Sequence, residues 1–303
     1  MKYLTLRQLR VLSAVTKTGS MVAAARQLYI SPSAITMRMR QLEEMAGLPL
    51  VERLGERTMP TAAGKVLLRA AHRIEALLAE CGQEIARLKS IKGGRVVAGV
   101  ASTASYFAPK ALAAFRQKHP EVELRLLVRN RQEMITALRD LALDLAIMGR
   151  PPENLDLESV VLGDHPYIVV AAGDHPLAGK DLTIQGLVNE TFFIREMGSG
   201  TRMLMDGLFQ DAGFTPNTGL EIGLDDETIK QAVIAGLGIA LISAHTVAYE
   251  IGDGRLKALK VEGLPVVRKW YVVRLREKSV MPAAEAMWRF LASEGHLFLP
   301  KAG

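Results

Sequence analysis

Polar and cationic side chains recur at one kind of place in the C-terminal two thirds of the chain, namely where a predicted strand ends and a helix begins. Ser102 and Thr103 follow one such strand, and Arg150 follows another. Hydroxyls, guanidinium groups and helix N-termini are the donors that bind anionic oxygens. We therefore predict one anion-binding site. Its predicted residues are Ser102, Thr103, Asn130, Arg131, Gln132, Arg150, Arg195, Ser199, Gly200, Thr201, Arg202 and Thr228.

The segment 195–202 reads Arg-Glu-Met-Gly-Ser-Gly-Thr-Arg and joins a predicted strand to a predicted helix. Its glycines let backbone N–H groups approach an anion, while its hydroxyls and arginines can contact oxygens. Taken singly, each predicted site residue is better explained as a helix cap or a surface group. Their recurrence at the same topological place in two halves of the sequence favours a ligand site.

A second chemical pattern lies on a predicted helix at residues 33–45. Ile35, Met39 and Leu42 are spaced i, i+4 and i+7, so they should face a small core. The opposite face carries small hydroxyls and a guanidinium, which suit a helix in a DNA major groove, although any solvated amphipathic helix also has a polar face. The predicted DNA-binding residues are Ser31, Ser33, Thr36, Met37, Arg38, Arg40, Arg53 and Arg57.

Short helices and a hairpin are predicted to position this face. Apolar spacing predicts helices at 5–18 and 21–28, and Ser31 can cap the third helix. Two helices joined by a tight turn form a helix-turn-helix. Two short apolar runs around Gly55 predict a hairpin, whose arginines would form a wing that reaches phosphates.

A long helix from Thr61 to about Lys89 should follow. Its apolar positions alternate at spacings of four and three, which predicts a heptad seam and pairing with a second copy of the chain. Packing against its own chain would give the same pattern. Cys81 lies on the seam and is interpreted as a small apolar packing group rather than a redox sensor. The predicted dimerisation residues are Leu67, Ala71, Ile74, Leu78, Cys81, Ile85 and Leu88.

The remaining sequence alternates strand and helix patterns, which predicts a parallel sheet with covering helices. A hinge is expected at 90–94, and two similar α/β units imply two subdomains with a cleft between them. We place the two chain crossings near 164–166 and 264–266. The predicted strands are 95–100, 122–129, 143–149, 167–172, 191–194, 220–224, 239–243 and 266–274, and the predicted helices are 107–118, 132–141, 201–212, 228–235 and 283–294.

Charge is distributed unevenly along the 303 residues. The formal net charge is +6, but residues 1–90 hold 14 basic and 7 acidic side chains, while the rest of the chain has a net charge of −1. Chance clustering of basic side chains is the alternative explanation. This asymmetry predicts an N-terminal module for a polyanion and a neutral module for something else.

Several functional classes find no support in the sequence. One cysteine excludes an intrachain disulfide framework and a cysteine-cluster zinc site. No window of about 18 uncharged apolar residues predicts a membrane span, and Arg7 and Arg10 fall where a secretory signal needs an apolar run. We find no nucleophile elbow, Walker motif or paired-histidine motif. We expect a cytoplasmic protein that is not an enzyme and has no catalytic residues, metal or cofactor.

The run LRQLRVLSAVTKTGSMVAAARQLYISPSAITMRMRQLEEMAGLPLVER, followed by MPTAAG, resembles the N-terminal domain of LysR-type transcriptional regulators. The stretches LDLAIMGRPP, ETIKQAVIAGLGIALISAHTV and GDGRLKALKVEGLPVVRKWYVVR are similar to the LysR-type regulators of Calvin-cycle operons, which control RuBisCO genes. The resemblance spans essentially the full chain.

The resemblance implies a winged helix-turn-helix at 1–60, a linker and dimerisation helix at 61–89, and an α/β effector domain like periplasmic binding proteins. Subdomain I would comprise 90–164 plus 266–303, and subdomain II 165–265. The implied partners are a pseudo-palindromic double-stranded DNA operator, RNA polymerase and a small anionic effector, either a phosphorylated metabolite or NADPH. The chain would form a homodimer that assembles to a homotetramer, with no membrane partner.

Two positions depart from the family pattern. Met37 stands where many relatives carry a polar or basic residue, which weakens direct base readout there. Asp225-Asp226 stands where Ser-Asn is expected, and two acids beside the cleft would repel a phosphate. The four arginines among the predicted effector residues still favour an anion. The alternatives are a regulator of another metabolic operon with a carboxylate effector, or a small-molecule binding protein without a DNA role.

Overall fold

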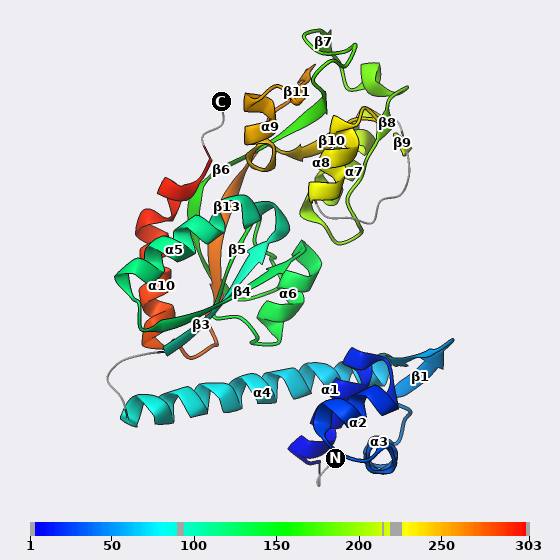
Figure 1. Cartoon of the computed structure of the whole chain (residues 1–303), viewed down its shortest axis with the longest axis vertical. Helices are drawn as coiled ribbons and strands as arrows, with labels where there is room; N and C mark the ends of the chain where they lie inside the picture. The colour runs from blue at the N-terminus through cyan, green and yellow to red at the C-terminus, as the bar shows by residue number, and fades with distance from the viewer. Residues whose placement is uncertain (1–3, 90–93, 214, 219–225, 301–303) are drawn as a thin grey trace. The chain divides into compact units, whose positions relative to one another are not determined.

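The computed structural model describes residues 4–89, 94–213, 215–218 and 226–300. The chain divides into two compact units, one formed mainly by residues 1–82 and the other by residues 83–139 and 143–303. Figure 1 shows both units and labels their helices and strands. Each unit is described by itself below.

Three helices with hydroxyl caps open the N-terminal unit. They are α1 (Leu6–Thr18), α2 (Met21–Leu28) and α3 (Pro32–Ala46). The side chains of Thr5, Ser20 and Ser31 accept hydrogen bonds from backbone N–H groups of the first turn of each helix, which satisfies donors that have no partner inside a helix. Gly19 and Gly47 end α1 and α3 in the left-handed conformation. The predicted helix-turn-helix is confirmed.

A small apolar core holds these helices together. Ile35, Met39 and Leu42 of α3 are at most 2% exposed and pack with buried residues of α1 and α2, so the predicted inward face of this helix is confirmed. The hairpin forms from β1 (Val51–Leu54) and β2 (Arg57–Pro60), an antiparallel pair. The backbone N–H of Thr58 in β2 donates to Gly19 O at 2.9 Å, which ties the hairpin to the turn between α1 and α2.

The long helix α4 (Ala62–Lys89) corrects part of the predicted dimerisation seam. Leu67 and Ala71 are 4% and 1% exposed and lie in the core of their own unit, against which Ile74 also packs. Apolar spacings of four and three residues occur in any helix that buries one apolar stripe. Here the first turns of α4 bury that stripe against their own chain. Leu78, Cys81 and Ile85 are exposed. The side chain of Leu88 lies outside the described residues.

The second unit is built around one mixed sheet with strand order β10-β6-β13-β5-β3-β4. Its longer elements, in chain order, are β3 (Gly94–Ala101), α5 (Ala108–Lys118), β4 (Val122–Arg129), α6 (Arg131–Arg139), β5 (Leu145–Met148), β6 (Leu157–Ala172), α7 (Gly200–Ala212), α8 (Asp226–Ile234), β10 (Ala240–Ser243), β13 (Val266–Leu275) and α10 (Pro282–Glu294). Its short elements are η1 (Ser102–Tyr106), β7 (Asp181–Leu182), η2 (Gln185–Leu187), β8 (Thr191–Phe192), β9 (Asn217–Thr218), η3 (Ala244–Thr246), α9 (Ala248–Gly252), β11 (Leu256–Ala258), β12 (Lys260–Val261) and η4 (Gly295–Phe298).

Separate apolar cores define two subdomains. In the first, Val96, Ala98 and Val100 of β3 face α5 and α10, while α6 lies on the other face of the sheet (Figure 1). The second subdomain has cores around α7 and around α8, both packed on the C-terminal half of β6 and on β10. The predicted fold class, a winged helix-turn-helix, a long helix and a two-subdomain α/β unit, is confirmed.

Two long strands, β6 and β13, run through both subdomains. They pair antiparallel from Leu157–Leu275 to Tyr167–Val266, and β6 then continues to pair with β10 and β11. The register shifts between Trp270 and Tyr271, opposite Gly163. Gly163 has φ 152°, and a Cβ there would lie 2.5 Å from Leu299, so only glycine fits this bulge.

The sheet differs from the expected parallel one because these two strands run in opposite directions. Strands β4, β3 and β5 are parallel, but β13 is antiparallel to both of its neighbours. The predicted crossing at 164–166 lies inside β6, and β13 begins at Val266. The predicted strand 220–224 and residues 90–93 of the predicted hinge lie outside the described residues. The proposed domain boundaries stay predictions.

Candidate functional site

The exposed face of α3 carries the first group of predicted site residues. The Met37 side chain is 55% exposed and that of Arg40 82% exposed. Thr36 Oγ1 donates to Pro32 O at 3.1 Å, and Arg40 Nε donates to Glu44 at 3.0 Å. These exposed contacts are weak enough to be exchanged for contacts with a ligand.

The serines at the start of α3 are already engaged in capping. Ser31 Oγ accepts from Ala34 N at 3.2 Å and lies 2.9 Å from Ser33 Oγ. Both residues are exposed, whereas Arg38 is half-buried. The start of α3 therefore presents two hydroxyls on one surface, which suits a phosphate of the DNA backbone.

The wing is fixed to α3 by a carboxylate. Glu43 Oε1 accepts from the backbone N–H groups of Leu50 at 2.9 Å and Val51 at 3.4 Å. Both wing arginines are exposed; Arg53 Nε donates to Gly55 O at 3.1 Å, and the stem of Arg57 lies against Gly19. The exposed polar face of α3 and two wing arginines thus belong to one rigid unit.

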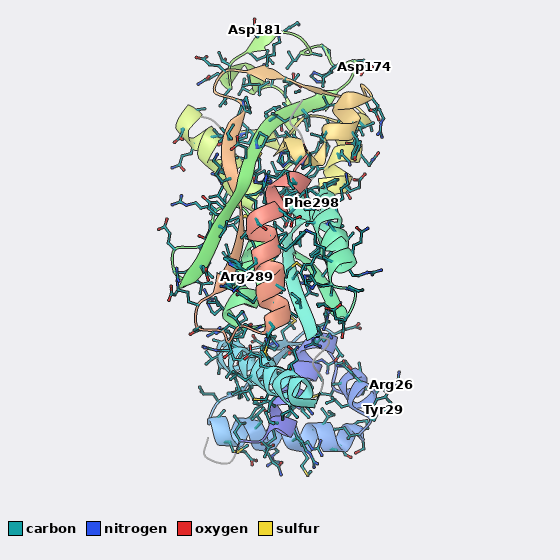
Figure 2. The ribbon with its side chains drawn as sticks, turned by 90° about the vertical axis from the view of Figure 1, so that its left-hand side faces the viewer. Arg26, Tyr29, Asp174, Asp181, Arg289 and Phe298 are labelled. Carbon is teal, nitrogen blue, oxygen red and sulfur yellow. The ribbon has the colours of Figure 1, made fainter. Side chains whose placement is uncertain are left out.

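Two exposed residues beside this face were not predicted. Tyr29 ends α2 at φ 55° and is 95% exposed, and Arg26 is exposed one turn earlier. Figure 2 shows both side chains projecting from the helix-turn-helix. Tyr29 has left-handed backbone angles, which are uncommon for residues other than glycine, and its side chain has no packing role here. In the sequence, only the tight Tyr29–Ile30 connection pointed to these residues.

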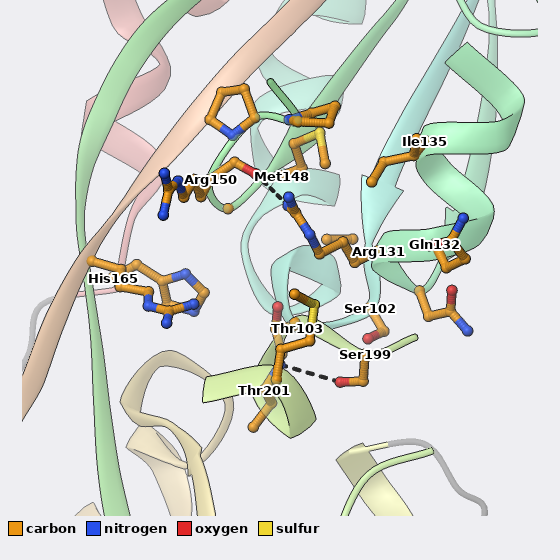
Figure 3. A pocket seen from close by; sticks show the side chains of 18 of the residues that line it. Ser102, Thr103, Arg131, Gln132, Ile135, Met148, Arg150, His165, Ser199 and Thr201 are labelled. Carbon is orange, nitrogen blue, oxygen red and sulfur yellow. Dashed lines mark hydrogen bonds between the residues drawn. The ribbon is translucent and has the colours of Figure 1, made fainter. Parts of the chain in front are cut away.

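A cavity of 560 Å³ collects most of the predicted effector residues in the second unit. It lies between the carboxyl ends of strands in the first subdomain and the start of α7 in the second (Figure 3). The predicted residues that line it are Ser102, Thr103, Asn130, Arg131, Gln132, Arg150, Arg195, Ser199, Gly200 and Thr201. Sequence-distant residues from both subdomains therefore share one cavity.

Loop geometry brings the two sides of this cavity together. Ser199 caps α7 by accepting from Thr201 N at 3.2 Å, so the helix N-terminus points at the cavity. Gln132 N donates to Gly198 O at 3.1 Å. Gly198 has φ 89°, and a Cβ there would lie 2.9 Å from the Gln132 side chain. Only glycine allows this approach between the two subdomains.

Arg195 is held by acidic side chains. It is 5% exposed, its Nε donates to Glu196 at 2.7 Å, its Nη2 donates to Ser102 Oγ at 3.0 Å, and its Nη1 donates to Asp226. Burial opposes the charged form, but the two carboxylates outweigh it and raise the pKa of Arg195. Asp226 therefore neutralises a cavity arginine from within the protein, and Asp225 lies outside the described residues.

The opposite wall gathers cations without such compensation. Among the described residues, neither Arg131 nor Arg268 forms an ion pair with an acidic side chain. Arg131 Nη1 donates to Arg150 O, and Arg150 pairs with Glu153 at the rim. Burial, and then the positive charges of Arg268 and Arg150, lower the pKa of Arg131. An anion bound here would relieve that repulsion.

Two predicted effector residues do not line the cavity. Arg202 Nε donates to both oxygens of Asp206, one turn along α7, at 2.8 and 3.0 Å, and its Nη1 donates to Arg195 O at 3.3 Å, so the guanidinium is bound by other parts of the protein. Thr228 lies in α8 and is likewise absent from the lining. The sequence predicted that both residues lie near the start of a helix, but it did not indicate the direction in which each side chain points.

Several lining residues were missed because they come from the crossing strands. His165 and Tyr167 belong to β6 and Arg268 to β13. Burial raises the pKa of Tyr167 to about 12. These residues lie within strands rather than after them, so a search for polar residues at strand ends could not find them. The other unpredicted lining residues are Ala101, Ile135, Arg139, Met148, Gly149, Pro151, Pro152, Glu153, Asn154 and Met203.

Within the described residues, no group of three or more His, Cys, Asp or Glu side chains is placed to hold a metal ion. In the same part of the chain, no helix combines the length and apolar character needed to cross a bilayer.

Comparisons with known proteins match both units. Residues 6–65 match the bacterial regulatory helix-turn-helix protein of the lysR family, and residues 91–295 match the LysR substrate binding domain. The chain is 52% identical over 300 residues to the HTH-type transcriptional regulator CbbR of Xanthobacter flavus, covering 98% of this chain and 90% of the relative. It is 41% identical to the RuBisCO operon transcriptional regulator of Allochromatium vinosum, covering 96% and 97%.

Solved structures agree with the fold. The Synechocystis PCC6803 CcmR regulatory domain, in complex with 2-PG, is 36% identical with a TM-score of 0.63, covering 67% of this chain and 97% of that one. The LysR family transcriptional regulator CbnR is 22% identical with a TM-score of 0.69, covering 96% and 99%. The second likeness supports the fold alone.

Proposed function

Because the chain belongs to the LysR family of transcriptional regulators, we propose that it controls a RuBisCO operon, in response to a phosphorylated metabolite bound in the 560 Å³ cavity. Relatives at 52% and 41% identity over nearly the full chain, named CbbR and RuBisCO operon regulator, support the target genes. In this proposal the chain is a regulator rather than an enzyme, and its activity is binding.

The DNA contact is proposed for the face that joins α3 and the wing. Arg40 and the hydroxyls of α3 would enter the major groove, while Arg53 and Arg57 would approach phosphates. Tyr29, which ends α2 and is 95% exposed, has a hydroxyl suited to a phosphate oxygen. The excess positive charge of residues 1–90 supports this assignment.

The effector proposal depends most on one observation, namely the pair Arg131 and Arg268. Both line the cavity, and among the described side chains neither has an acidic partner. Arginines that line a cavity can bind phosphoryl oxygens through charge-assisted hydrogen bonds. The α7 N-terminus, with Ser199 and Thr201, supplies further donors. A 36% identical regulatory domain solved with 2-PG supports the ligand class.

The proposed assembly is a dimer through the exposed half of α4 and a tetramer formed by two such dimers, which would present paired helix-turn-helix units to a pseudo-palindromic operator. Leu78, Cys81 and Ile85 supply exposed positions for the α4 contact. A regulator of this kind would act on RNA polymerase at the promoter.

A gel-shift assay tests the DNA part with the promoter that neighbours the chain's own gene. We expect a sequence-specific shift that weakens with salt. Arg40→Ala should weaken DNA binding and reduce the slope of log binding constant against log salt concentration by about one. The control Arg289→Ala, an exposed residue of the other unit, should change neither. A wild-type chain that fails to discriminate this promoter from unrelated DNA would refute the proposal.

A further inference from the structure

A histidine lies where the two crossing strands meet the cavity. His165 of β6 is paired in register with Arg268 of β13, and both residues line the cavity. His165 is only 1% exposed. Figure 3 shows its ring on the same side of the pocket as Arg150, across from Ser199 and Gln132. A polar ring this deeply buried must be explained by its hydrogen bonds.

One face and one nitrogen of the ring are fixed. The ring stacks on Trp270 with centroids 3.7 Å apart and planes 15° apart, and Nε2 lies 3.0 Å from Ser243 Oγ. Trp270 is itself fixed, because its indole N–H donates to His245 Nδ1 at 3.0 Å. The His165 ring therefore cannot rotate without disturbing both subdomains.

The other ring nitrogen, Nδ1, has no partner. It is buried and makes no hydrogen bond to any residue that the structure describes. A Cβ built on Gly149, which also lines the cavity, would lie 4.0 Å from Nδ1. An unpaired buried nitrogen is unfavourable, and a ligand atom in the cavity is the available partner.

The charge state of the ring limits what that partner is. Burial comes first, followed by the interaction with His245 and the positive charge of Arg268. Together they lower the pKa of His165 to about 2, so the ring is neutral. A neutral imidazole holds one proton, and Ser243 can donate its hydroxyl proton to Nε2. Nδ1 then carries the proton and is a donor. The cavity's arginines select anionic oxygens, which only accept hydrogen bonds.

We infer that His165 is an effector-binding residue, whose neutral ring donates Nδ1–H to an anionic oxygen of the bound ligand. The inference rests on the proposed function, since it takes the cavity as the effector site. His165 would add an uncharged hydrogen-bond donor to the cavity. It would therefore discriminate between ligands by the position of their oxygens rather than by their net charge. Because His165 and Arg268 lie on the two strands that join the subdomains, the ligand would contact both of these connecting strands.

Calorimetry with the full chain and 2-PG tests this. His165→Phe keeps a ring on Trp270 but has no nitrogen, and we expect its Kd for 2-PG to rise about tenfold. His165→Asn places an amide N–H near the position of Nδ1 and should recover most of the affinity. His175→Phe is the matched control, because His175 lies outside the cavity and pairs with Glu190.

Direct observation of the proton completes the test. In chain labelled with ¹⁵N-histidine, NMR should show His165 protonated at Nδ1 when 2-PG is bound. An unchanged Kd in both variants, or a proton on Nε2 in the complex, overturns the inference while leaving the proposed function in place. A wild-type chain that binds neither 2-PG nor inorganic phosphate overturns the proposed effector class and the inference with it.

Discussion

At the scale of single residues, the cavity divides its arginines into two kinds. Arg195 is neutralised by Glu196 and Asp226, whereas Arg131 and Arg268 have no acidic partner among the described residues. An arginine already bound to two carboxylates gains little from a further anion, because the anion must compete with them. The free energy of binding an anionic effector should therefore come from Arg131 and Arg268.

Replacing Arg131 tests this division. Arg131→Gln should raise the Kd for 2-PG between tenfold and a hundredfold, since a hydrogen bond to a charged group contributes roughly 1.5–3 kcal/mol. Arg129→Gln is the control, because Arg129 is exposed at the end of β4 and does not line the cavity. Calorimetry on both variants checks the prediction, and equal losses in both would show that only the overall charge matters.

The neutral His165 should also make stability depend on pH. Its pKa is about 2 in the folded chain and about 6.5 in the unfolded chain. Between these values the unfolded chain binds one more proton, so acid favours unfolding, and the contribution is fully present only above pH 6.5. Lowering the pH from 7.5 to 5.5 should cost about 1.4 kcal/mol through this residue.

Denaturant unfolding of the wild type and His165→Phe at these two pH values measures that contribution. The wild type should lose more stability than the variant, by about the amount given above. His245, whose pKa burial also lowers, acts in the same direction in both proteins and cancels in the comparison. Identical pH dependence in the two proteins would mean that His165 gains a proton without unfolding.

At the scale of elements, the sequence predicted best where local chemistry decides the outcome. Helices α1, α2 and α3 begin at hydroxyl caps, and α1 and α3 end at glycine, so their bounds agree with prediction within about two residues. Burial of Ile35 followed from spacing alone. Ten of twelve predicted effector residues line the cavity. Six of them follow β3, β4 or β5, parallel strands that bring their carboxyl ends to one edge, and the other four lie in the segment that leads into α7 or in its first turn.

Prediction was poorer where distant contacts decide the outcome. Strand β6 begins at Leu157, ten residues before the predicted start, because pairing with β13 extends it through Pro166. The direction of Arg202 depends on Asp206, and the burial of Leu67 depends on α1 to α3. Spacing identifies an apolar stripe on a helix but not the surface that covers it.

Helix α4 allows a test that separates its two halves. Leu78→Glu combined with Ile85→Glu places charges on exposed apolar positions, and it should remove the α4 contact and reduce the size of the assembly without unfolding the N-terminal unit. Leu67→Ala removes a buried side chain and should destabilise that unit by about 2–5 kcal/mol. Sedimentation and thermal unfolding distinguish these outcomes. A double variant whose assembly keeps the size of the wild-type assembly would place the dimer contact elsewhere.

At the scale of the whole molecule, the two modules separate the two kinds of binding. Residues 1–90 have a net charge of +7 and include the α3 and wing surface, while the remaining residues have −1 and include the cavity. A ligand in one module can influence the other only if it binds two states of the chain with different affinities. Regulation is then a coupling free energy between the cavity and the DNA-binding face.

Coupling of this kind is reciprocal, which gives a quantitative prediction. If 2-PG changes the operator Kd by some factor, operator DNA must change the 2-PG Kd by the same factor, typically 5- to 150-fold. Fluorescence anisotropy of labelled operator and calorimetry of 2-PG, each with and without the other ligand, measure both factors. Arg40→Ala should weaken operator binding yet preserve the factor, because α3 lies outside the cavity. Arg131→Gln should weaken 2-PG binding at the cavity and leave operator affinity without ligand unchanged. A factor of one in both directions would mean that ligand binding in the cavity does not change the affinity for operator DNA.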